Sequence, residues 1–177
     1  MNTLIVSCSH HPHSKSFSLA QRAFRHLQEI QVTSTFSDLT KLSLPLCDGD
    51  SAYGNPTVQS VTLQVAAADA IFLAVPIYNY AVNAAAKNFI ELTGSGWEGK
   101  VVGFLCAAGG DASYMSIMSL ANSLMLDFRC LVVPRFVYAT GKHFEGNHLT
   151  DPKIEERVIQ LVNETVRITK ALKMPSI

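Results

Sequence analysis

Charged residues are scarce in this chain, and neither sign dominates. They make up 16% of the 177 residues, and 14 Lys and Arg balance 14 Asp and Glu, so the formal net charge is zero. A neutral chain lacks the basic surface of a nucleic-acid-binding protein, and we expect no nucleic-acid partner. Hydrophobic residues reach 48%, which argues against disorder and supplies a core for one domain over residues 1–177.

Long apolar runs are also missing. The richest stretch, residues 65–77, is interrupted by Asp69 and Pro76 and is too short to span a bilayer. Residues 3–6 are too few for a secretory signal and have no basic flank. We therefore expect a cytoplasmic protein with no membrane partner.

The four cysteines do not form any C-x-x-C pair, which argues against a zinc site or a disulfide framework. Cys8, Cys106 and Cys130 lie in apolar runs, where a free thiol behaves as a small hydrophobic side chain. We expect unpaired cysteines, a reducing compartment and no bound metal.

What the chain does have is an alternation of short apolar runs with longer segments of helical periodicity. The predicted strands cover residues 4–6, 31–36, 70–75, 101–106 and 131–133. The predicted helices cover residues 17–27, 57–67, 83–92 and 113–126, and a last helix begins at Pro152 after an Asp151 cap. This alternation predicts a three-layer, doubly wound α/β fold with a five-stranded parallel sheet in the order 2-1-3-4-5.

Ligands of such sheets bind beyond the carboxyl ends of the strands, so the loops after strands one, three and four carry the functional information. The first loop, residues 7–18, is rich in hydroxyls and leads into a helix whose first N–H groups are free, which favours a phosphate. The fingerprints G-x-G-x-x-G and G-x-x-x-x-G-K-[ST] are absent, which argues against a Rossmann dinucleotide site and a P-loop. The alternative is that Ser14 or Ser16 only caps the helix.

The second and third loops follow the third and fourth strands. Tyr78 and Asn79 come directly after Pro76, which we expect to end the strand, at the edge where a planar ligand would lie. Gly109 and Gly110 would let backbone N–H groups approach a ligand closely. Taken singly, each loop also suits an ordinary turn or surface packing. Their expected convergence on one sheet edge favours a binding site.

Three blocks of residues, in order and with suitable spacing, resemble the NAD(P)H-dependent FMN reductases of the flavodoxin-like superfamily. The first block is residues 14–20, SKSFSLA, which matches S-x-N-x-x-L-A except that Ser16 replaces Asn. The second is residues 76–79, PIYN, followed by Lys87-Asn88, and the third runs from Gly99-Lys100 to Gly109-Gly110. The arginine usual in the family's first loop is missing, and histidines stand near its place. We interpret Lys87 and Asn88 as structural.

The resemblance implies a flavodoxin-like fold, FMN as cofactor and NAD(P)H as hydride donor, in a homodimer or homotetramer. Hydride would pass directly between the cofactors, so no catalytic side chain is expected. Ser9, Ser14 and Ser16 would hold the phosphate, and the other two loops would contact the flavin ring. Because the phosphate carries about two negative charges and the usual arginine is missing, Lys15 and the loop histidines are candidates to offset that charge. The FMN-binding residues implied are Ser9, His11, Ser14, Lys15, Ser16, Pro76, Ile77, Tyr78, Asn79, Ala108, Gly109 and Gly110.

Three other functions fit the same scaffold. A reductase with tightly bound FMN could pass electrons to quinones, azo compounds or metal oxyanions, and the three loops would be the same. A flavodoxin-type electron carrier is usually strongly acidic, which the neutral charge of this chain does not match. A receiver-type signalling domain would need acidic residues after the first strand, where Ser7-Cys8-Ser9 stands instead.

Overall fold

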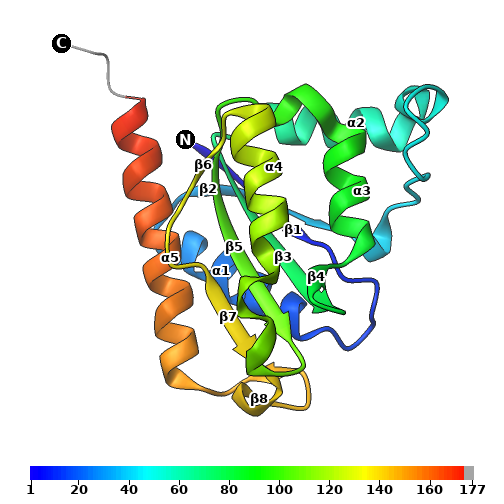
Figure 1. Ribbon diagram of the computed structural model, residues 1–177. Coiled ribbons are helices and arrows are strands. Elements are labelled where there is room, and N and C mark those ends of the chain that lie inside the picture. Colours follow the sequence, from blue (N-terminus) through cyan, green and yellow to red (C-terminus); the bar gives the residue numbers. More distant parts are fainter. Residues whose placement is uncertain (174–177) are drawn as a thin grey trace.

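A seven-stranded sheet forms the middle layer of the protein, whose computed structural model describes residues 1–173 (Figure 1). Its strands are β1 (Asn2–Ser7), β2 (Thr33–Asp38), β3 (Ala70–Tyr78), β4 (Ala81–Val82), β5 (Val101–Ala108), β6 (Leu131–Val132) and β7 (Val137–Thr140). The main path β2-β1-β3-β5-β6 is parallel throughout, while β7 pairs in parallel with β5, and β4 forms an antiparallel hairpin with β3. The five predicted strands therefore lie in the predicted order.

Within the described residues, five α-helices cover the two faces of the sheet (Figure 1). They are α1 (Lys15–Glu29), α2 (Pro56–Ala67), α3 (Ala84–Thr93), α4 (Met118–Phe128) and α5 (Pro152–Leu172). Along β1, Leu4 and Val6 point into a core shared with α2, α3 and α4, whereas Ile5 points into a second core shared with α1 and α5. This alternation produces the three-layer architecture expected from strands that are apolar on both faces.

The third strand does not end at Pro76, as we expected, but continues to Tyr78 with Pro76 opposite Ala107 of β5. Strand β1 has already ended at Ser7, opposite Ala74, so residue 76 has a neighbouring strand on one side only. The missing N–H of proline therefore costs no ladder hydrogen bond there.

The fifth strand is shorter than predicted and has a second part that we did not predict. It stops at Val132, Arg135 adopts a left-handed conformation with φ of 59°, and the chain returns to β5 as β7. A break over residues 133–136 thus divides one edge strand into two, and this division together with the short strand β4, which we did not predict, gives the sheet seven strands rather than five.

Smaller differences concern the ends of elements. The second strand begins at Thr33 rather than Gln31, because Gln31 has a positive φ of 56° beyond α1. The predicted helix over 113–126 is a 3-10 helix, η4 (Asp111–Ile117), that continues into α4. A short turn, η5 (Gly141–His143), and a two-stranded sheet of β8 (Phe144–Glu145) and β9 (His148–Leu149) precede α5.

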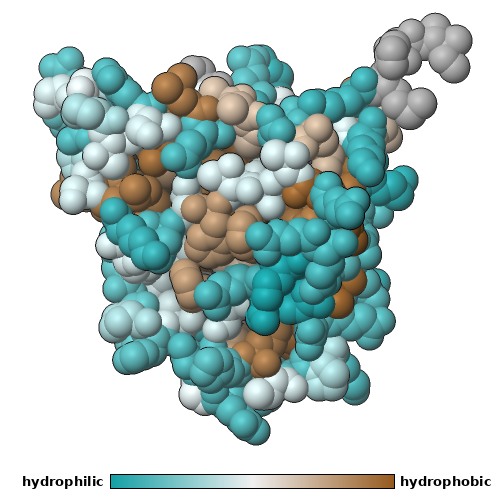
Figure 2. Space-filling model, turned by 180° about the vertical axis from the view of Figure 1, so that it is seen from behind, coloured by the Kyte–Doolittle hydropathy of each residue, from teal (hydrophilic) through white to brown (hydrophobic). Residues whose placement is uncertain are grey.

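The outer surface mixes apolar and polar residues. Seen from behind, apolar side chains reach the surface in separate patches between hydrophilic ones (Figure 2). Across residues 1–173, every helix is too short or too polar to cross a lipid bilayer.

Candidate functional site

A cleft of about 820 Å³ opens at the carboxyl edge of the sheet, where the loops after β1, β3 and β5 meet. Every one of the predicted FMN-binding residues lines it. Six further residues line it as well, namely His13, Tyr80, Ala107, Asp111, Ala112 and Ser113. The geometry thus brings the three predicted loops together, while the role of each residue in binding stays a prediction.

The first loop ends in a well-capped helix. Ser14 is the N-cap of α1, and its hydroxyl accepts a hydrogen bond from the N–H of Phe17 at 3.2 Å. The Ser14 and Ser16 hydroxyls lie 2.8 Å apart, and both side chains are buried in the wall of the cleft. The role of Ser14 as helix cap therefore does not prevent the two serines from lining the cleft.

Several donors of this loop remain free within residues 1–173. The Ser9 oxygen accepts from the N–H of His11 at 3.1 Å, which leaves its own hydrogen available. Only one of the Ser14 and Ser16 hydroxyls can donate to the other, so a second hydroxyl hydrogen is also available. The first N–H groups of α1 add donors and a positive dipole end.

The histidines of the loop divide into two groups. His11 and His13 line the cleft, whereas His10 does not. The N–H of His13 donates to Nδ1 of His11 at 3.1 Å, so the hydrogen of a neutral His11 ring lies on Nε2.

Among the described residues, no group of histidine, cysteine and acidic side chains is arranged so that it could hold a metal ion. Ser18 lies outside the cleft and donates to the carbonyl of Asn147.

The second loop is a tight hairpin between β3 and β4. Asn79 and Tyr80 form its two-residue turn, with φ of 50° and 62°, which is the pattern of a type I′ turn. Glycine is the usual second residue of such a turn, and a bulky side chain there is strained. Tyr80 nevertheless occupies it with 70% of its surface exposed, next to the half-exposed Tyr78.

The third loop follows β5, and its glycines have ordinary backbone angles. Gly110 is extended, with φ of −155° and ψ of 178°, and a Cβ added to Gly109 or Gly110 would meet nothing within 4 Å. Gly110 therefore does not use the left-handed backbone angles that favour glycine. The glycines instead leave open space in the cleft wall.

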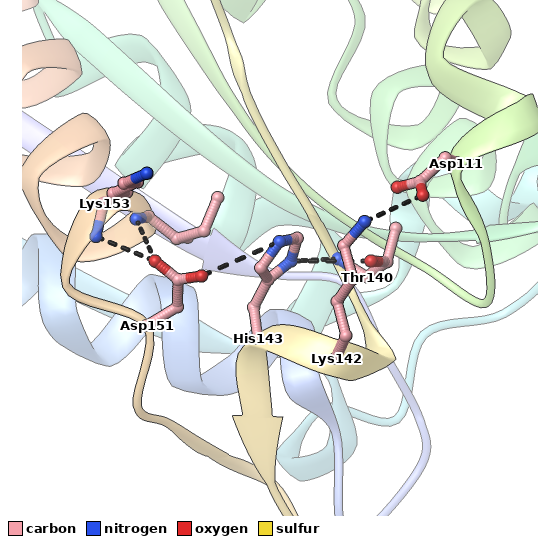
Figure 3. A network of polar contacts seen from close by, with 7 residues as sticks. Asp111, Thr140, Lys142, His143, Asp151 and Lys153 are labelled. Atoms are coloured by element: carbon pink, nitrogen blue, oxygen red, sulfur yellow. Dashed lines mark hydrogen bonds and ion pairs between the residues drawn. The ribbon is translucent and has the colours of Figure 1, made fainter.

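Polar contacts from η5, which follows the neighbouring strand β7 at the same edge of the sheet, reach the third loop (Figure 3). Lys142 of η5 points to Asp111 and forms an ion pair at 2.8 Å, and this hydrogen bond lowers the pKa of Asp111. His143 lies between Thr140, whose N–H donates to Nδ1 at 2.9 Å, and Asp151, which is 3.8 Å from Nε2. Asp151 also caps α5, so the contacts of His143 connect that helix end to the last residue of β7.

Two asparagines near the second loop have structural contacts. Asn83, buried before α3, donates through its side chain to the carbonyl of Cys8 at 2.6 Å. Asn88 accepts from the N–H of Cys47 at 2.8 Å and donates to the carbonyl of Pro45 at 2.9 Å. These contacts agree with our structural interpretation of Asn88. Asn83 and Tyr138, discussed below, were missed because their partners are remote in sequence.

The sequence and fold match proteins of known type. The family model of NADPH-dependent FMN reductases matches residues 1–145. An NAD(P)H-dependent FAD/FMN reductase of Geobacillus thermodenitrificans is 34% identical over 140 residues, which cover 77% of this chain and 75% of that protein. An NADPH azoreductase of a Bacillus species is 26% identical over 136 residues, covering 76% and 74% of the two chains.

Solved structures with low sequence identity have the same fold. FerB of Paracoccus denitrificans, a flavoenzyme NAD(P)H:(acceptor) oxidoreductase, superposes with a TM-score of 0.78 at 17% identity, covering 96% of this chain and 97% of that one. An apo NADH:FMN oxidoreductase gives a TM-score of 0.77 at 18% identity, covering 98% and 91%. The match of the family model over most of the chain, together with the relative at 34% identity, shows that this protein belongs to the NADPH-dependent FMN reductase family.

Proposed function

We propose that this protein is an NAD(P)H-dependent FMN reductase whose cofactor lies in the cleft at the sheet edge. One observation supports the proposal most strongly. A hydroxyl-rich helix N-terminus, an aromatic hairpin and an open glycine loop all line the same cleft. When bound there, FMN would accept hydride from a reduced nicotinamide and supply the redox chemistry.

The first loop fits the phosphate of FMN. Free hydroxyl hydrogens of Ser9 and of the Ser14–Ser16 pair, together with the first N–H groups of α1, form a compact set of donors. Lys15, His11 and His13 line the same cleft, and their side chains can offset negative charge. These residues would hold the phosphate and fix its position.

The other two loops fit a flat ring system. Residues 76–79 offer backbone groups and the Tyr78 side chain, and the glycine loop presents N–H groups with no backbone partner within residues 1–173. Because Gly109 and Gly110 leave open space, a ring can approach these donors closely. The protein thus positions and orients the cofactor, and no side chain of the cleft is required as acid or base.

A second candidate function is a reductase that retains FMN and passes electrons to an aromatic acceptor. The 26% identity to an NADPH azoreductase supports this alternative, as do the exposed rings of Tyr78 and Tyr80 at the cleft. An azo compound or a quinone is planar and could stack on such rings. A flavodoxin-type carrier has less support, because the chain has no net charge.

The test begins with the visible spectrum of the purified protein and identification of any flavin released on denaturation. The protein is then mixed with FMN and with NADH or NADPH, and oxidation of the nicotinamide is followed. We expect FMN-dependent oxidation. Retention of FMN through gel filtration during turnover would favour the second candidate, and loss of reduced FMN would favour a supplier of free flavin. A protein that neither binds FMN nor oxidises a nicotinamide would contradict the proposal.

We also propose a cytoplasmic homodimer or homotetramer. Several large apolar side chains are exposed, including Leu126 at 84%, Met115 at 63% and Leu63 at 71%, and association would remove such surface from water. The four cysteines are free, and three are buried, as suits a reducing compartment. Light scattering coupled to gel filtration would measure the assembly, and a monomer at micromolar concentration would contradict it.

A further inference from the structure

The glycine loop has little packing of its own to fix its conformation. Neither Gly109 nor Gly110 has a neighbour within 4 Å of the position of a Cβ. Their N–H groups make no backbone hydrogen bond within residues 1–173. A glycine has wide freedom of φ and ψ, so the peptide between Gly110 and Asp111 could rotate unless another group restrained it.

A tyrosine from the neighbouring strand supplies that restraint. Tyr138 of β7 lies opposite Cys106 of β5 and is only 8% exposed. Its hydroxyl donates to the carbonyl of Gly110 at 2.5 Å. The same hydroxyl oxygen lies 2.8 Å from the hydroxyl of Ser113.

Counting hydrogens assigns the direction of both contacts. A tyrosine hydroxyl has one hydrogen, and the carbonyl of Gly110 can only accept, so Tyr138 donates to Gly110. The Ser113 hydroxyl must then donate to Tyr138. A short relay from Ser113 through Tyr138 therefore ends on the Gly110 carbonyl.

Holding this carbonyl also fixes an N–H group. The chain has no cis peptide in the described residues, and in a trans peptide the carbonyl of Gly110 and the N–H of Asp111 point in opposite directions. The Asp111 N–H is thereby directed away from the Tyr138 hydroxyl. It is the first N–H of η4, has no acceptor within residues 1–173, and belongs to a residue that lines the cleft.

We infer that Tyr138 is a positioning residue, which locks the Gly110–Asp111 peptide so that the Asp111 N–H stays available to the flavin ring. The inference rests on the proposed function. The ion pair of Lys142 with Asp111 is a weaker restraint, because both side chains are more than half exposed and solvent screens the pair. The Tyr138 side chain is mostly buried, so its hydrogen bond to Gly110 is less accessible to water than that ion pair.

Tyr138→Phe removes only the hydroxyl and keeps the packed ring, so it tests the inference directly. We expect FMN affinity, measured by flavin fluorescence titration, to fall about three- to tenfold, as for loss of one hydrogen bond. Donors near the ring favour its reduced form, so the midpoint potential of bound FMN should become more negative. In the protein without FMN, the amide resonances of Gly110 and Asp111 should broaden or double.

Three variants serve as controls. Tyr114→Phe alters a neighbouring ring, 5.3 Å from that of Tyr138, whose hydroxyl makes no hydrogen bond in the described residues, and it should change nothing. Ser113→Ala should act in the same direction as Tyr138→Phe but more weakly. Lys142→Met should change FMN affinity less than Tyr138→Phe does, and a larger effect would overturn the assignment to Tyr138.

The outcomes separate this inference from the proposed function. If the native protein fails to bind FMN, the proposed function fails. If the native protein binds FMN and a stably folded Tyr138→Phe variant has the same affinity, potential and amide spectrum, only the positioning role is wrong. A fall in thermal stability with an unchanged potential would show that Tyr138 is merely structural, and would also overturn the inference.

Discussion

The side-chain amide of Asn83 donates to the main-chain carbonyl of Cys8 at 2.6 Å, and the N–H of Asn83 donates to the carbonyl of Pro76 at 3.2 Å. One buried residue at the start of α3 therefore ties the first loop of the cleft to the second. The two loops are joined to each other by this residue rather than only through the sheet below them.

Asn83→Ala should destabilise the fold by about 1 kcal/mol, because the carbonyl of Cys8 loses its buried donor. The cost is moderated because the side-chain oxygen of Asn83 is itself buried without a partner, and the substitution removes it. Urea denaturation of the native protein and the variant measures the difference. Asn122→Ala, at an exposed position on α4, is the matched control and should be neutral. Equal stability of both variants would show that the Asn83 contact contributes nothing.

Gly110→Val should abolish tight FMN binding and leave the fold intact. The backbone of Gly110 is extended and its Cβ position is open, so the protein itself accepts a branched side chain. In the proposed complex the valine would occupy space that the ring needs, and we expect a loss of affinity of about tenfold or more, as for a steric clash of about 1.4 kcal/mol. Gly54→Val, at another open glycine outside the cleft, controls for the loss of glycine. Unchanged FMN affinity in Gly110→Val would place the ring elsewhere.

The architecture was predictable because it depends on local pattern and on one rule of chain geometry. Strands such as Ala70–Tyr78 are apolar on both faces, and parallel strands bring their carboxyl ends to one edge. Predicting which loops meet therefore required no contact information. The break in the last strand was not predictable in this way, because the left-handed Arg135 has no local signal and β7 is held by pairing with β5.

The supporting contacts of the cleft were missed for a related reason. Asn83 and Cys8 are 75 positions apart, and Tyr138 and Gly110 are 28 apart. Hydrogen bonds between remote residues leave no periodicity in the sequence. The one available signal was the aromatic Tyr138 among the smaller residues of β7, because a buried tyrosine usually finds a partner for its hydroxyl.

Tyr80→Gly should make the protein more stable and should weaken FMN binding in the cleft. Tyr80 has a positive φ of 62° in a two-residue turn where glycine is favoured, so relief of strain should stabilise the fold by about 1 kcal/mol. The exposed ring also lines the cleft, and its removal should weaken FMN binding. Urea denaturation and fluorescence titration measure the two effects. Tyr80→Asn should have an intermediate stability, and a less stable Tyr80→Gly variant would contradict the strain argument.

Ser16→Ala should weaken binding of FMN but not of riboflavin. Ser16 is fully buried beside Ser14 at the start of α1, where we propose that the phosphate end of FMN binds. Loss of one hydroxyl should lower FMN affinity about three- to tenfold, and riboflavin, which has no phosphate, should bind weakly and equally to both proteins. Ser18→Ala, whose hydroxyl contacts Asn147 outside the cleft, is the control. Equal affinity of the native protein for FMN and riboflavin would remove the phosphate assignment altogether.

Histidines stand in this chain where the family's first loop usually has an arginine. An FMN phosphate carries about two negative charges near neutral pH, and a nearby imidazole is most helpful when protonated. We expect FMN affinity to fall as the pH rises from about 6 to about 8, since histidine loses its charge over this range. Without the histidines, affinity should hold or increase, because the phosphate gains charge over the same range. The structure sharpens the test, since His11 and His13 line the cleft and His10 does not. The double variant His11→Gln/His13→Gln should therefore lose the pH dependence, while His10→Gln should keep it. Identical pH profiles for the native protein and the double variant would assign the phosphate to the hydroxyls, Lys15 and the α1 N–H groups alone.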